Sequence, residues 1–265
     1  MRVISLQERE MPIHTVEKQH FLCRYTYRRA RETQAENDIG QDYFSFFIEN
    51  QSIMFAVCDG VSLSFCGDVA ARFLGERLVD WLQALRAERE AHMLQESLFQ
   101  YLQDLTREGT AAVNQHPLPD FVTGLLREVL EEKRKHGSET MYVCGRIDVE
   151  GEQVKLVLAY QGDLRIRLFG SGSEQTYLLG DTLHTSERWS SKQGCVGGKP
   201  TVFVRQWHIS EAINRVAIYS DGLALLDNYI HMPHEAELEQ LVQKSQQAPT
   251  SDDVCLLDIF VREGR

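Results

Sequence analysis

Short apolar runs that end in turn residues recur along the chain, and this pattern predicts β-strands. Glycine-containing turns separate several of these runs, as in a meander of antiparallel strands. The runs are residues 18–30, which alternate as an exposed strand does, then 43–49, 53–58, Met141–Val149, Val154–Tyr160, Arg165–Phe169, Gln175–Leu179, 201–208, 215–220 and 253–261.

Apolar residues at helical spacing begin at Gly67 and predict a helix from that point. The same periodicity predicts helices over 92–114, 118–135 and 234–246, whereas residues 181–199 are polar and glycine-rich and are expected to form a surface loop. No linker, repeat or low-complexity tract divides the chain, which favours a single domain over 1–265. Because strands and helices are segregated and do not alternate, the order indicates an α+β fold with antiparallel sheets.

Composition narrows the functional classes. The chain has 265 residues, 43% of them apolar, and a formal net charge of -11, which argues against nucleic acid as a partner. Its six cysteines form no C-x-x-C pair, so we expect reduced thiols and a cytoplasmic location. No segment has the apolar length of a secretory signal or a membrane span, so no membrane association is expected.

Aspartates stand where the predicted strands end. Asp59 and Asp221 each follow an apolar run directly, Asp252 precedes the last strand, Asp42 precedes the run at 43–49, and Asp163 lies in a turn between two strands. Carboxylates that converge in one cleft repel one another unless a cation lies among them. Oxygen ligands select a hard divalent ion, so the pattern predicts a Mg²⁺ or Mn²⁺ site.

These motifs, in this order, resemble those of a known family. From about residue 20 to 262 the chain is similar to the PPM-type, metal-dependent protein serine/threonine phosphatases (the type 2C class), as a divergent, bacterial-like member. The matching segments are Gln41-Asp42, Ala56-Val57-Cys58-Asp59-Gly60, Ala159-Tyr160-Gln161-Gly162-Asp163-Leu164-Arg165, Ser220-Asp221-Gly222 and Ser251-Asp252-Asp253.

The resemblance implies a four-layer α-β-β-α sandwich, with two antiparallel sheets flanked by helices. It implies hydrolysis of phosphoserine and phosphothreonine in protein substrates by water activated at a binuclear Mg²⁺ or Mn²⁺ site. In that site Asp59 bridges both ions, and the Gly60 carbonyl binds one of them. Asp221 and Asp252 bind the other ion, and Asp42 orients the attacking water. Asp163 helps Asp221 to hold a third, weaker ion.

The chain also departs from the family pattern. Asn37 occupies the position where the family usually carries a phosphate-binding arginine, and Arg29 or Arg31 could replace that arginine. Segment 61–65 replaces a Gly-Gly pair, and Leu164 replaces a serine.

Two other hypotheses therefore stay open beside the enzyme. In the first, the chain is a catalytically weak or inactive phosphatase-fold module that binds a phosphoprotein without turnover. In the second, it is an ordinary α+β domain in which the Asp-Gly pairs are plain turns, a common use of this dipeptide.

Overall fold

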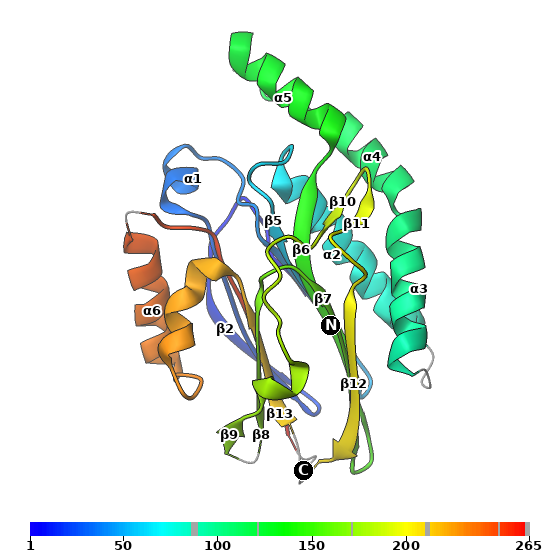
Figure 1. Ribbon diagram of the computed structural model, residues 1–265. Helices are drawn as coiled ribbons and strands as arrows, with labels where there is room; N and C mark the ends of the chain where they lie inside the picture. Colours follow the sequence, from blue (N-terminus) through cyan, green and yellow to red (C-terminus); the bar gives the residue numbers. More distant parts are fainter. Residues whose placement is uncertain (86–89, 121, 171, 210–212, 249, 263–265) are drawn as a thin grey trace.

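The computed structural model describes residues 1–85, 90–120, 122–170, 172–209, 213–248 and 250–262 (Figure 1). Two antiparallel sheets form its centre. The eight-stranded sheet contains β1 (Arg2–Ile4), β4 (Tyr43–Glu49), β5 (Ser52–Gly60), β6 (Glu139–Glu150), β7 (Gln153–Gln161), β10 (Arg188–Ser190), β11 (Gly194–Val196) and β12 (Thr201–His208). The six-stranded sheet has the order β2 (Met11–Lys18), β3 (Phe21–Arg28), β14 (Val254–Val261), β13 (Ile213–Tyr219), β8 (Arg165–Gly170), β9 (Ser173–Glu174).

Helices cover the outer faces of both sheets (Figure 1). The described residues form the helices α1 (Arg31–Ala35), α2 (Gly67–Ala84), α3 (Ala91–Asp104), α4 (Thr106–Gln115), α5 (Gly124–His136) and α6 (Glu235–Gln247), with 3-10 helices η1 (Thr176–Leu179) and η2 (Asp221–Asn228). Of these, α2 and α3 pack on the eight-stranded sheet and α6 packs on the six-stranded sheet. No helix among the described residues is long and apolar enough to cross a membrane. Helix α5 buries none of its side chains and projects from the body (Figure 1).

Three apolar clusters hold the layers together. Between the sheets, side chains such as Phe46 of β4 pack with Leu257 of β14. Leu74 of α2 belongs to a second cluster on the outer face of the eight-stranded sheet, and Leu238 of α6 belongs to a third on the other sheet. Because β5 is covered on both faces, its sequence is continuously apolar and does not alternate. The arrangement confirms the four-layer α+β sandwich.

Several predicted elements are wrong in detail. Residues 18–30 contain β3, which is an interior strand between β2 and β14 and not an exposed one. The helix over 92–114 is two helices, α3 and α4, with a break at Leu105. Helix α5 begins at Gly124, later than the predicted 118, and Phe121 lies outside the described residues. Strands β1 and β2 were not predicted, because the N-terminal region is polar and its apolar and polar residues alternate only weakly.

The region after β8 was also mispredicted. Residues Gln175–Leu179 are not a strand: Thr176–Leu179 form the helix η1, because the chain turns back after Gln175 donates its N–H to the Leu168 carbonyl. The expected loop over 181–199 contains a short hairpin, β10 and β11. Trp189 in this hairpin is fully buried, stacks on Phe73 and donates its indole N–H to the Leu102 carbonyl at 3.0 Å. Long-range packing therefore decides the structure of this segment.

Candidate metal centre

The end of the eight-stranded sheet places Asp42 beside Asp59. Strands β4 and β5 pair with Tyr43 opposite Cys58, so the aspartates that flank this pair are cross-strand neighbours. Asp42 is buried and Asp59 is partly buried. The proximity that the sequence predicts for these two residues is confirmed by the register.

The end of the six-stranded sheet places Asp221 beside Asp252. Ser220, the last residue before η2, donates its N–H to the Cys255 carbonyl at 3.0 Å, and its hydroxyl donates to the Asp253 carbonyl at 3.1 Å. These bonds tie the exit of β13 to the entry of β14. Asp221 and Asp252 therefore leave the sheet side by side, as their placement at strand ends predicts.

Two glycines allow the close backbone approach at this end of the sandwich. A Cβ atom on Gly60 would lie 2.5 Å from the backbone of Gly67 and 2.8 Å from the Gln41 carbonyl oxygen. A Cβ atom on Gly222 would lie 2.0 Å from the carbonyl oxygen of Asp253. Any side chain at either position would push the carboxylate-bearing segments apart.

The aspartates of both sheets affect one another electrostatically. Burial raises the pKa of Asp59 well above its usual range, and the charges of Asp221, Asp252 and Asp163 raise it further. Burial is also the main reason why the pKa of Asp42 is raised well above its usual range, and the charge of Asp59 raises it further. Burial also raises the pKa of Asp221, ahead of the charges of Asp252 and Asp163, although solvent screens part of this repulsion because Asp221 is exposed. Residues from distant parts of the chain thus form one acidic cluster.

The donor set fits a hard cation that keeps part of its water shell. Oδ2 of Asp42 is buried and has no hydrogen-bond partner within the described residues, so it is an acceptor that needs a donor or a cation. In the described ranges, no group of three or more acidic, histidine or cysteine side chains is arranged to hold a metal ion by itself. Mg²⁺ commonly binds through one or two carboxylates and several waters, so an open cluster of this kind suits it better than it suits a zinc site.

Asp253 has a different role from its neighbour Asp252. Its carboxylate is buried and accepts hydrogen bonds from the backbone N–H groups of Ala30 at 2.6 Å, of Gln41, and of Asp42 at 3.4 Å. It therefore clamps the chain that leads into Asp42. Sequence reasoning missed this residue, although two adjacent aspartates before a buried strand must point in different directions.

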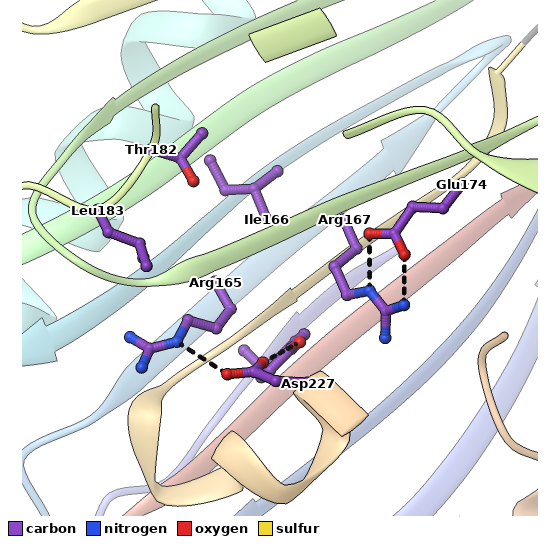
Figure 2. A pocket seen from close by; sticks show the side chains of 8 residues that line it. Arg165, Ile166, Arg167, Glu174, Thr182, Leu183 and Asp227 are labelled. Atoms are coloured by element: carbon purple, nitrogen blue, oxygen red, sulfur yellow. Dashed lines mark hydrogen bonds and ion pairs between the residues drawn. The ribbon is translucent and has the colours of Figure 1, made fainter. Parts of the chain in front are cut away.

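Arg165 is the arginine that lies beside the acidic cluster. Its charge lowers the pKa of Asp221, against the stronger influences that raise it. One guanidinium nitrogen donates to the Asp163 carbonyl at 2.6 Å, and Nε lies 3.5 Å from Asp227 (Figure 2). The side chain lines a cavity of 210 Å³, together with Thr182 of the segment after η1 (Figure 2).

Arg29 and Arg31, the two arginines expected to replace the missing phosphate-binding arginine, have different surroundings. Arg29 is buried and held by Glu10, at 2.7 and 3.3 Å, and by the carbonyl of Asp38, so its guanidinium is already engaged. Arg31 is exposed at the start of α1, and Asn37 is exposed after that helix. The expectation for Arg29 is therefore wrong.

A protein-family model matches most of this chain. A family model described as protein phosphatase 2C matches residues 29–256. A search of curated protein sequences returned no significant match.

Solved structures with the same architecture have low sequence identity. The serine/threonine phosphatase Stp1 from Staphylococcus aureus is 17% identical, with a TM-score of 0.59 over 96% of this chain and 99% of that one. A serine-threonine phosphatase 2C from Toxoplasma gondii is 14% identical, with a TM-score of 0.55 over 96% and 98%. RsbX, solved in complex with magnesium, is 15% identical, with a TM-score of 0.54 over 94% and 99%. At this identity the likeness establishes the fold.

Proposed function

Because this chain belongs to the protein phosphatase 2C family of serine/threonine protein phosphatases, we propose that it hydrolyses phosphoserine and phosphothreonine in proteins at a binuclear Mg²⁺ or Mn²⁺ site. The observation that carries the proposal is the acidic cluster, in which Asp59 from one sheet is within electrostatic reach of Asp221 and Asp252 from the other. A divalent cation among these carboxylates would offset their mutual repulsion and their burial.

Each aspartate has a separate part in this proposal. Asp59 would hold both ions, with the Gly60 carbonyl as a further ligand of one, and Asp221 and Asp252 would hold the other. Asp163 shares a third, weaker ion with Asp221. When bound, a pair of such ions about 3.5–4 Å apart lowers the pKa of water and neutralises phosphoryl charge. Asp42 then accepts a hydrogen bond from the attacking water, a role that its unpartnered Oδ2 supports.

Arg165 is the residue that we assign to the substrate phosphate. Its side chain lies beside Asp221 and borders an open cavity, whereas Arg29 is paired with Glu10. A guanidinium binds a phosphate group through paired hydrogen bonds, and so it can position the ester without becoming covalently involved.

Hydrolysis of a phosphopeptide tests the proposal. Asp59→Asn keeps the shape of the side chain but removes a ligand charge, so we expect Mn²⁺-stimulated turnover to fall by about 10³-fold or more. Asp104→Asn, at an exposed position of α3, is the matched control and retains turnover. Calorimetric titration with Mn²⁺ supplies a second readout, in which Asp59→Asn loses affinity. Unchanged turnover in Asp59→Asn contradicts the assignment.

One observation favours a second candidate, a module that binds phosphoproteins without turnover. Asn37 stands exposed where the family usually has its arginine, and Arg29 does not compensate for it. A wild-type protein that binds Mn²⁺ yet leaves phosphopeptides intact would support this alternative. In either case we place the chain in the cytoplasm, since all six of its cysteines are free thiols.

A further inference from the structure

A cavity of 420 Å³ lies on the outer face of the six-stranded sheet, next to the start of α6. Three arginines line it, namely Arg24 of β3, Arg215 of β13 and Arg262 after β14. We call it the arginine pocket. Asp258 of β14 is five residues beyond Asp253, which directly precedes that strand, and so it lies about 17 Å along the strand direction from the metal centre. The arginine pocket is therefore a separate site.

The charges in the arginine pocket do not balance. Asp258 is 2% exposed, and it accepts hydrogen bonds from Arg24 Nε at 2.9 Å and from Arg215 Nε and Nη2 at 2.7 and 2.8 Å. One carboxylate thus serves two guanidinium groups. Arg262 is paired with Glu17 at 2.9 Å, at the rim. Within the described residues, a positive charge is left over in a largely buried place, which is unfavourable without a counter-charge.

Arg24 also has an unused donor. The residue is 9% exposed, and its Nη2 is buried and lies 2.8 Å from Asp258 Oδ2. That contact is not a hydrogen bond, and Nη2 has no hydrogen-bond partner among the described residues. Nη1 of Arg24 donates to the Pro233 carbonyl at 2.8 Å. Nη2 is therefore the guanidinium nitrogen of Arg24 that is left to donate to a further acceptor.

The start of α6 adds to the positive character of the arginine pocket. Pro233 and His234 line the cavity, and His234, the residue before the helix, makes no side-chain capping bond. The N-terminal end of a helix carries a partial positive charge that favours anions. The acidic residues of the first turn, Glu235 and Glu237, are not among the lining residues.

The rest of the lining is apolar, with Leu22, Met232 and Phe260 beside the arginines. We propose that the arginine pocket binds a small organic anion, whose phosphate or carboxylate group lies beside Asp258 against Arg24, Arg215 and Arg262 and whose apolar part contacts Met232 and Phe260. Paired guanidinium groups suit a planar or tetrahedral oxyanion. The volume is in the range of small-ligand sites.

Calorimetry on protein stripped of divalent ions and held in Tris–chloride tests this proposal, because the acidic cluster then has no cation to attract a phosphate. The probes are phenyl phosphate, benzoate and inorganic phosphate. We expect saturable binding of at least one aryl probe, with a rise in melting temperature. The stronger of phenyl phosphate and benzoate identifies the headgroup, and tighter binding of phenyl phosphate than of inorganic phosphate supports the apolar contact.

Variants place the binding in the arginine pocket. Arg215→Gln should weaken binding about tenfold or more, because a charge-assisted hydrogen bond is lost. Its fold should persist, since Asp258 keeps its partner Arg24. Arg205→Gln, exposed on β12 of the other sheet, is the matched control. If Arg215→Gln does not fold, Arg262→Gln decides in its place. Absence of saturable binding for every probe, or binding equal to wild type in the folded variant, overturns the proposal.

Discussion

At the scale of single residues, the adjacent aspartates 252 and 253 show how one dipeptide serves two purposes. Asp252 is exposed at the acidic cluster and raises the pKa of Asp59 and of Asp221. Asp253 is buried and satisfies three backbone N–H groups, which fixes the chain before Asp42. The hydrogen bonds to Asp253 therefore hold this segment in place, although the carboxylate of Asp252 repels those of Asp59 and Asp221.

Alanine at each position should have opposite effects on the metal-free protein. Asp253→Ala leaves buried N–H groups unpaired, so we expect the free energy of unfolding to fall by about 2–4 kcal/mol. Asp252→Ala removes a repelling charge from Asp59 and Asp221, so stability should stay equal or rise. Urea unfolding of both variants without divalent ions measures the difference. Equal losses in the two would show that Asp253 is not the clamp.

At the scale of elements, most strands and helices could be predicted, because β5 and α2 have strong apolar patterns of the expected period. The failures have physical causes. Thr176–Leu179 has strand-forming residues, yet it forms η1 where the chain folds back on β8. The hairpin of β10 and β11 depends on Trp189, which is buried against partners far away in the sequence, Phe73 and Leu102.

The first turn of helix α2 contains Asp68, whose ionisation should affect the stability of the protein. Burial raises the pKa of Asp68 from 3.8 to about 6, and the charge of Arg72 offsets only part of this shift. A carboxyl whose pKa is raised on folding makes the folded state less stable once it ionises. The cost is absent below about pH 4, develops between 3.8 and about 6, and is complete at neutral pH.

Asp68→Asn should therefore stabilise the protein at neutral pH by about 1–2 kcal/mol and leave its stability unchanged near pH 4. Thermal or urea unfolding at the two pH values measures this difference. Asp80→Asn, at an exposed position of the same helix, controls for the general loss of a negative charge. A stabilisation of equal size at both pH values would show that the effect does not arise from ionisation of Asp68.

At the scale of the whole molecule, the sandwich brings the start of β4 and the end of β5 close to the end of β13 and the start of β14, since the charges of Asp221 and Asp252 at one sheet raise the pKa of Asp59 at the other. The sequence alone could predict Asp59, Asp221 and Asp252 as candidates, since the first two follow an apolar run and the third precedes one. It could not show that Arg29 is engaged with Glu10, or that the charge of Arg165 acts on Asp221. Those relations depend on contacts between distant segments, for which local pattern carries no signal.

Anomalous diffraction from crystals of this protein soaked in Mn²⁺ tests the central claim most directly. The account predicts two peaks about 3.5–4 Å apart, as in two-metal sites generally. One peak should lie against Asp59 and the Gly60 carbonyl, and the other between Asp59, Asp221 and Asp252. Well-diffracting crystals with no manganese at these carboxylates, or with the ion bound elsewhere, would contradict it.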